Sequence, residues 1–367
     1  MLILAEASRH DLACACGTGD KGEHRRRDAS NQAWLYPVSL AGGGGGIMFK
    51  TLLSSACVGD CGYCPLRAGE DKVRRCTLGA DELARLFLEH NRRRRLLGLF
   101  VSSGIIRDPD HTMARLNGVA AVLRRKYGYR GYIHLKVIPG ASDAAIAEAV
   151  GLASAVSLNI ETPSAKHCAT LSGRKVWERD IMRPIRLIRD LLLNLPGRRR
   201  VRQTTQFIVG AAAESDREIL DKTGELYAEH RLERVYFSAY QRGPGRAGLP
   251  GEERPDPDIL TREHRLYQAD FLLRKYGFSR DDLPFGPAGR LSLAADPKKC
   301  WADAHPEFFP LRLRTAERWQ LLRVPGLGPV TVERLLSARR ETHIRGLADL
   351  RLGGGRAGPA AGYLDFS

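Results

Sequence analysis

Three cysteines that lie close together are the residues best suited to chemistry. Cys57, Cys61 and Cys64 have the spacing C-x3-C-x2-C. Three thiolates on one short loop can bind three corners of an iron–sulfur cubane. The fourth iron then has no protein ligand and stays open to a substrate or cofactor, as the open position of a catalytic zinc does. The spacing therefore favours a [4Fe–4S] centre that takes part in a reaction.

A zinc site and buried free thiols are the alternatives for these cysteines. A structural zinc needs a fourth ligand, which Cys76 could supply. The aromatic Tyr63 directly before the third cysteine favours the cluster. The other cysteines have no evident partner and are expected to be unpaired thiols: Cys14, Cys16, Cys168 and Cys300.

The elements that must position this loop alternate between strands and helices. The expected strands are 47–54, 98–102, 132–138, 155–161, 202–209 and 234–241. Amphipathic helices are expected between them, near 80–94, 112–127, 143–150, 178–194 and 215–230. Six such units predict an α/β fold, a partial (β/α)6 TIM-like barrel, with the cysteine loop directly after the first strand.

Polar residues alternate with apolar ones along several of these strands. In 155–161, Ser157, Asn159 and Glu161 share one face of the strand, and the apolar residues share the other. Lys136, Gln206 and Tyr240 occupy similar places on other strands. A parallel sheet covered on both faces would be apolar on both. One face is therefore expected to line a ligand cavity.

With these residues in place, the sequence resembles the radical S-adenosylmethionine superfamily, whose cluster loop has an aromatic residue before its third cysteine. The resemblance implies two cofactors, a [4Fe–4S] cluster and S-adenosylmethionine chelated by its open iron. It also implies reductive cleavage to a 5′-deoxyadenosyl radical, which abstracts a hydrogen from the substrate. The electron is expected from a protein such as flavodoxin or ferredoxin. No catalytic residue beyond the cofactor site is assigned.

The resemblance also implies a set of cofactor-binding residues. These are Tyr63 near the adenine, then Ser102, Ser103 and Gly104 at the methionine amino group, Ser157, Asn159 and Glu161 at the ribose, and Gln206, Ile208 and Gly210 at the adenine. The segment 102–104 lacks the usual acidic residue, so its backbone carbonyls are expected to bind the amino group. The acid expected after the last group is displaced to Glu214.

A closer resemblance is to a bacterial family of DNA modification or repair radical S-adenosylmethionine proteins associated with uracil-DNA glycosylase-type partners. The matching segments are 99–106, 131–142, 202–216, 262–278, 296–301 and 321–327. Residues 18–46 and 162–176 depart from the family, and no role is assigned to them.

The segment around Gly326 and Gly328 resembles a helix–hairpin–helix element. The glycines allow the backbone to approach a phosphate, and the next helix presents free N–H groups to it. Arg323 and Arg334 would add attraction that does not depend on base sequence. Duplex DNA is therefore the expected partner, and a plain packing hairpin is the alternative.

The expected organisation is an N-terminal extension (1–46), the barrel (47–245), a loop and helix segment (246–310) and the hairpin module (311–367). The formal charge of +16 permits a polyanionic partner, although arginine-rich composition alone can produce it. No membrane span or secretory signal is expected, so the predicted location is the cytoplasm.

Three functions remain open from the sequence. The first is a radical enzyme that acts on DNA. The second is the same chemistry on RNA, a nucleotide or a protein. The third is a non-enzymatic DNA-binding protein in which iron–sulfur or zinc only stabilises the fold.

Overall fold

The computed structural model describes residues 2–8, 34–39, 44–71, 73–195, 200–254, 256–342, 344–346, 349 and 358–367. Cys14 and Cys16 lie outside the described residues. Contacts divide the chain into two units, Met1–Glu214 with Glu225–Leu260, and Ser215–Gly224 with Thr261–Ser367. Residues 261–310 therefore group with the C-terminal segment, which differs from the boundaries expected at 245 and 310.

The first unit is built on one sheet with the strand order β1-β2-β3-β4-β5-β6-β7. Its strands are β1 (Leu35–Ser39), β2 (Gly45–Leu52), β3 (Gly98–Ser102), β4 (Tyr132–Lys136), β5 (Ala155–Ser157), β6 (Arg202–Val209) and β7 (Arg234–Ala239). The strands from β2 to β7 are parallel to their neighbours, in sequence order. The two edge strands, β1 and β7, do not pair with each other, so the sheet stays open. The predicted partial barrel of six parallel strands is confirmed.

An additional strand, β1, lies where the sequence predicted an irregular extension. It pairs antiparallel with β2, and Leu35 is opposite Phe49. Proline is tolerated on an edge strand because its missing N–H faces away from the ladder, and Pro37 occupies such a place. The helix α1 (Leu2–Ser8) also belongs to this region and packs on β2.

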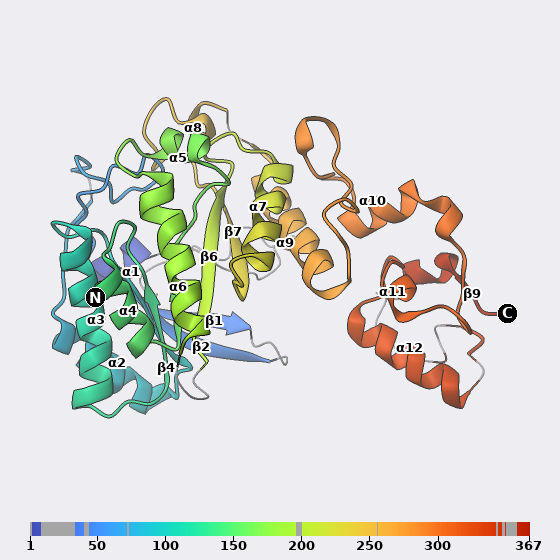
Figure 1. Cartoon of the computed structure of the whole chain (residues 1–367), viewed down its shortest axis with the longest axis horizontal. Coiled ribbons are helices and arrows are strands. Elements are labelled where there is room, and N and C mark those ends of the chain that lie inside the picture. Colours follow the sequence, from blue (N-terminus) through green and yellow to red (C-terminus); the bar gives the residue numbers. More distant parts are fainter. Residues whose placement is uncertain are drawn as a thin grey trace. The chain divides into compact units, whose positions relative to one another are not determined.

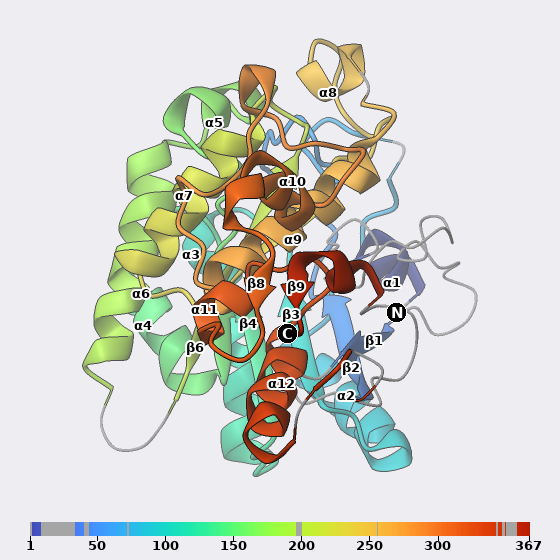
Figure 2. The same ribbon diagram turned by 90° about the vertical axis from the view of Figure 1, so that its right-hand side faces the viewer.

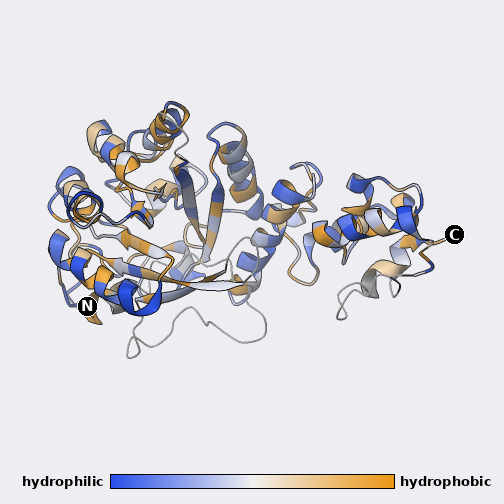
Figure 3. Cartoon of the chain, turned by 90° about the horizontal axis from the view of Figure 1, so that it is seen from below, coloured by the Kyte–Doolittle hydropathy of each residue, from blue (hydrophilic) through white to orange (hydrophobic). Residues whose placement is uncertain are grey.

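Helices connect the parallel strands. They are α2 (Ala80–Arg94), α3 (Pro109–Ala121) continued by the π-helix η1 (Val122–Lys126), α4 (Asp143–Leu152), α5 (Ala165–Leu171), the π-helix η2 (Trp177–Met182) continued by α6 (Arg183–Leu193), and α7 (Asp216–Ala228). The short helix α8 (Pro250–Glu253) follows the last strand of the sheet, β7. In Figures 1 and 2, α3, α4 and α6 group on one side of the strands. The outer helices carry both hydrophilic and hydrophobic stretches (Figure 3), as amphipathic helices on a sheet do. No described helix is long and apolar enough to cross a membrane.

The core of the first unit lies between the sheet and these helices. Phe49, Leu99 and Phe207 from the strands are fully buried, as are Leu83 and Phe87 on α2. Burying each such side chain contributes about 2 kcal/mol relative to exposure. The apolar face of the sheet is therefore held by the helices, and its polar face is left to line a cavity.

The second unit, taken by itself, is mostly helical. Its elements include α9 (Ile259–Lys275), α10 (Pro297–Ala304), α11 (Arg318–Leu321) and α12 (Pro329–Glu341), with the short strands β8 (Leu311–Arg312) and β9 (Leu364–Asp365). Leu321, Val324, Leu327, Val332 and Leu335 form part of its core. The turn between α11 and α12 has a positive φ of 83° at Gly326, which only glycine adopts at little cost.

Candidate active site

The cysteine loop lies at the C-terminal ends of β2 and β3. After β2, the Leu53 N–H donates to the Ser102 carbonyl at 2.7 Å, and the Gly104 N–H donates to the Ser54 carbonyl at 2.8 Å. The Val58 N–H then donates to the Ile105 carbonyl at 2.9 Å. The segment after β3 therefore holds the cysteine loop in place along its first half.

Backbone N–H groups point at two of the three sulfur atoms. The Cys57 sulfur accepts from the N–H groups of Gly59 at 3.3 Å and Ile105 at 3.4 Å. The Cys64 sulfur accepts from the Leu66 N–H at 3.4 Å. Burial nevertheless raises the pKa of the Cys64 thiol to about 12. A bound metal would supply the positive charge that these sulfurs need to be ionised.

The number of protein ligands, and not their spacing, separates a cubane from a structural zinc ion. A structural zinc is held by four protein ligands. A cubane takes one thiolate on each of three irons and leaves the fourth iron open.

Two neighbouring residues agree with this interpretation. A Cβ on Gly59 would lie 3.2 Å from the Cys57 sulfur and 4.0 Å from the Cys61 sulfur, so glycine leaves space beside both. Cys76, the candidate fourth zinc ligand, pairs through its backbone with Ser55 and does not line the cavity described next. The donor set therefore fits an iron–sulfur cluster with three protein ligands.

The three cysteines open into a cavity inside the first unit. Most of the predicted cofactor residues line it, namely Tyr63, Ser102, Ser103, Gly104, Asn159, Glu161, Gln206 and Ile208. The lumen candidates Lys136 and Tyr240 line it too. The sequence therefore identified most of the polar wall of this cavity.

Ser157 and Gly210 are the two predicted cofactor residues that do not line the cavity. The Ser157 hydroxyl lies 2.9 Å from Nε2 of His134 on the neighbouring strand, so its hydrogen-bonding partner is within the sheet. Gly210 has a φ of 88° and donates its N–H to the Glu214 carboxylate. Glu214 also accepts from the Ala212 N–H at 3.0 Å, and it therefore shapes the turn after β6.

Glu161 and Tyr63 form the central polar pair of the cavity. The Tyr63 hydroxyl donates to Oε1 of Glu161 at 2.6 Å. Burial and the adjacent carboxylate raise the pKa of Tyr63 well above its ordinary value, so it stays a proton donor. Oε2 of Glu161 and Oδ1 of Asn159 are buried and accept no hydrogen bond from the residues that the structure describes. Both oxygens can accept hydrogen bonds from hydroxyl or ammonium groups of a ligand.

The segment 172–176, which the sequence left without a role, also reaches the site. Asp60, in the cysteine loop, accepts hydrogen bonds from the Ser172 hydroxyl and from the N–H groups of Gly173 at 2.8 Å and Arg174 at 3.2 Å. Burial opposes ionisation of Asp60, but these hydrogen bonds outweigh it and lower its pKa. The signal available in the sequence was Asp60 itself, a carboxylate in a tight loop that needs donors.

Lys175 follows Arg174 and lines the cavity beside the cysteines. Its ammonium lies 5.9 Å from the centre of the Tyr63 ring. Burial lowers the pKa of Lys175, but Cys61 and Glu161 outweigh burial and raise it. The cavity wall therefore includes a basic side chain that the sequence did not reveal.

The predicted nucleic-acid residues all lie in the second unit, and they differ in availability. Arg334 on α12 is exposed. Arg323 is only 11% exposed, because it pairs with Asp282 at 3.1 Å and stacks on Phe278 and Trp301. Arg323 therefore stabilises the unit, and its guanidinium is not free for a phosphate as the sequence suggested.

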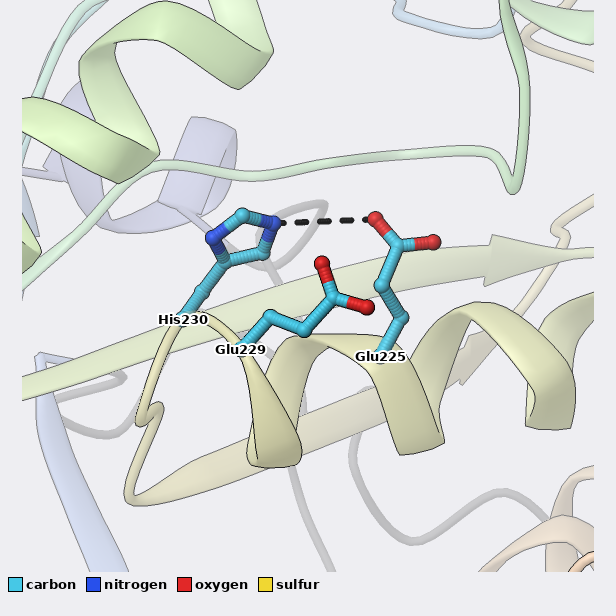
Figure 4. Close-up of side chains that lie close together, drawn as sticks. All are labelled: Glu225, Glu229 and His230. Atoms are coloured by element: carbon cyan, nitrogen blue, oxygen red, sulfur yellow. Dashed lines mark ion pairs between the residues drawn. The ribbon is translucent and has the colours of Figure 1, made fainter.

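Another group of potential metal ligands lies in the chain just before the N-terminal end of β7. Glu225, Glu229 and His230 have ligand atoms within 4.8 Å of one another, and Glu225 and His230 point toward each other (Figure 4). His230 Nε2 lies 3.6 Å from the Glu225 carboxylate. Arg189 already donates to the Glu229 carbonyl and places a positive charge nearby. We assign this group no function, because an ion pair at the end of α7 accounts for it.

No family model matches the chain, and no curated protein matches its sequence. Three solved structures illustrate the backbone similarity. Methylornithine synthase aligns over 62% of this chain and 61% of its own length, with 13% identity and a TM-score of 0.48. The FeFe-hydrogenase maturase HydG from Carboxydothermus hydrogenoformans aligns over 62% and 51%, with 13% identity and a TM-score of 0.47. A radical SAM methyltransferase from Sphaerobacter thermophilus aligns over 64% and 74%, with 14% identity and a TM-score of 0.44.

The chain spans less than two thirds of the length of the first two of these proteins. Similarity at this level assigns no reaction, which has to come from the residues of the site.

Proposed function

We propose that this chain is a radical S-adenosylmethionine enzyme that binds a [4Fe–4S] cluster through Cys57, Cys61 and Cys64 and acts on DNA. One observation carries the first part of this proposal. Three cysteines from one loop open into the same cavity as the unsatisfied oxygens of Asn159 and Glu161. When bound, the cluster would supply the electron that cleaves the sulfonium of S-adenosylmethionine.

The residues of the cavity have distinct tasks in this proposal. Asn159 and Glu161 accept hydrogen bonds from the ribose hydroxyls, and Tyr63 keeps the Glu161 carboxylate oriented. The carbonyls at 102–104 accept from the methionine ammonium, since no acidic side chain is present in that segment. Apolar neighbours such as Leu66, Ile105 and Ile138 line the same cavity and exclude water from the reacting atoms.

DNA is proposed as the substrate because of the hairpin in the second unit. The helix α12 begins after Gly328, so its first N–H groups are available to a phosphate, and Arg334 is exposed on the same helix. Lys298 donates to the Leu327 carbonyl at 2.5 Å and so fixes the turn between the two helices. A base within a duplex would have to flip out to reach a buried cavity. A flavodoxin or ferredoxin is the proposed electron donor, and a uracil-DNA glycosylase-type protein is a proposed partner.

The test is anaerobic reconstitution followed by assays of iron, acid-labile sulfide and 5′-deoxyadenosine, with and without duplex DNA. Cys61→Ala should lose both the cluster and cleavage of S-adenosylmethionine. Cys300→Ala is the matched control, because Cys300 lies on α10, is not one of the residues that line the cavity, and should change neither. Retained cleavage in Cys61→Ala would overturn the enzyme assignment. Cleavage that duplex DNA neither stimulates nor competes with would move the substrate to RNA, a nucleotide or a protein.

A further inference from the structure

We propose that Lys175 raises the reduction potential of the cluster through the Cys61 sulfur, and that Asp60 is the positioning residue that keeps it there. This inference rests on the proposed function, because it requires a cluster bound to Cys61. It concerns the segment 172–176, which departs from the family that the sequence resembles. The consequence would be a cluster that is easier to reduce than one without a neighbouring cation.

The segment that carries Lys175 is attached to the cysteine loop by several hydrogen bonds. Three donors converge on the Asp60 carboxylate from residues 172–174. On the other side of the cysteine loop, the Gly62 N–H donates to the Leu171 carbonyl at 2.7 Å. The Arg174 guanidinium donates to the Val58 carbonyl at 2.7 Å. The segment that carries Lys175 is therefore bound to the cysteine loop both before and after Cys61.

The charge of Lys175 lies in the wall of the cavity that the cysteines share. Lys175 lines this cavity together with Cys61, and its ammonium lies 5.9 Å from the centre of the Tyr63 ring. Lys136 also lines the cavity, and its ammonium lies 5.8 Å from the centre of the Phe100 ring on the neighbouring strand. Of these two lysines, Lys175 is the one whose segment is bound to the cysteine loop.

The positive charge of Lys175 affects how easily the cluster is reduced. A cubane with three thiolate ligands carries a net negative charge, which grows by one unit when one electron is added. A fixed cation therefore stabilises the reduced state more than the oxidised state, since the Coulomb energy scales with the product of the charges. Hydrogen bonds to the ligand sulfurs act in the same direction. Glu161, which lies near the same lysine, opposes this effect from the other side of the cavity.

The experiment compares wild type with Lys175→Met, Lys175→Arg and Ser172→Ala. The readouts are the midpoint potential of the reconstituted cluster, from a redox titration followed by electron paramagnetic resonance, and the Kd of S-adenosylmethionine. Lys175→Met should shift the midpoint to a more negative value, and Lys175→Arg should restore most of the shift. Ser172→Ala removes a donor to Asp60 without changing any charge, and it should shift the midpoint in the same direction by less, because the lysine is retained but held loosely. Lys166→Met on α5 is the control, because Lys166 is exposed and does not line the cavity.

Several outcomes would overturn the inference. An unshifted midpoint in both Lys175→Met and Ser172→Ala would do so. Weaker S-adenosylmethionine binding with an unchanged midpoint would instead assign Lys175 to the carboxylate of that ligand. Failure of the proposed function looks different, because wild type would then show no cubane signal at all. If Lys175→Met does not retain a cluster, Ser172→Ala provides the same comparison with the lysine still present.

Discussion

Replacing Gly104 by alanine tests the packing between the segment after β3 and the cysteine loop. A Cβ at this position would lie 2.3 Å from the Ala56 carbonyl oxygen and 3.1 Å from Cβ of Cys57. The first distance is roughly 1 Å shorter than ordinary van der Waals contact, and the obstacle is backbone, which cannot rotate away. Overpacking of this kind costs about 1–3 kcal/mol. The cysteine loop must therefore move outward.

That movement has a specific consequence at the cluster. The N–H of Ile105 donates to the Cys57 sulfur, and its carbonyl accepts from the Val58 N–H, so both bonds depend on the approach at Gly104. We expect Gly104→Ala to fold with a small loss of stability but to hold markedly less iron and sulfide after reconstitution. The measurements are iron and sulfide per chain, together with thermal unfolding.

Gly151→Ala is the matched control for this experiment. Gly151 lies on α4, and a Cβ there meets no atom within 4 Å. An alanine within a helix is more favourable than glycine by about 1 kcal/mol, so this variant should be as stable as wild type or more stable, with a full cluster. A Gly104→Ala protein with wild-type iron and sulfide would refute the close packing on which the reasoning depends.

Three further predictions concern single side chains. Tyr63→Phe removes the donor to the buried Glu161 carboxylate. It should weaken S-adenosylmethionine binding by about 2 kcal/mol, roughly thirtyfold in the Kd measured by calorimetry, with the cluster content unchanged. An unchanged Kd would exclude Glu161 from the binding site. Arg334→Gln should reduce the slope of log K against log salt for duplex DNA by about one, and a slope equal to that of wild type would contradict a phosphate contact. Arg323→Met should leave this slope unchanged. It should lower the free energy of unfolding by about 2 kcal/mol or more, because it breaks the pair with Asp282. Burial lowers the pKa of Lys298 from an ordinary 10.5 to about 7. Between pH 7 and pH 10.5 the unfolded chain therefore binds more protons at this residue than the folded chain does. As the pH rises through this range, Lys298 destabilises the fold less. The difference in Tm between Lys298→Met and wild type should therefore change in favour of wild type from pH 7 to pH 10, and a constant difference would refute the shift.

The elements that the sequence predicted well are those with strong local signals. The bounds of β3, β6 and α2 agree with the predicted ranges, because their apolar patterns are regular and end at clear stops. The helix α2, for example, is closed by Arg95 in the left-handed conformation with a φ of 44°. The cysteine loop was also predictable, because the spacing of three ligands in one short segment needs no tertiary contact.

The features that the sequence did not predict depend on contacts between distant residues. Asp60 and Ser172 are 112 residues apart, and neither belongs to a recognisable motif. The strand β1 is short, contains Pro37 and depends on pairing with β2 for its conformation. The burial of Arg323 could not be inferred either, since an arginine next to a glycine-rich turn is usually exposed. In each case the partner, and not the local pattern, determines the role of the residue.

The early end of β5 shows how such contacts build the cavity. A strand over 155–161 was predicted, but β5 ends at Ser157, and the chain then bends so that Glu161 pairs through its backbone with β6. The Glu161 N–H donates to the Gln206 carbonyl at 2.9 Å, and its carbonyl accepts from the Ile208 N–H at 2.8 Å.

This arrangement places Glu161 at a φ of 66°, in the left-handed region. Holding a residue other than glycine there costs on the order of 1 kcal/mol, and glycine at this position would remove the strain. A regular strand would avoid the cost, but the carboxylate would then no longer meet Tyr63 at the cluster loop. The strained backbone is therefore best explained by the carboxylate that it positions, which supports a role for Glu161 in binding the cofactor.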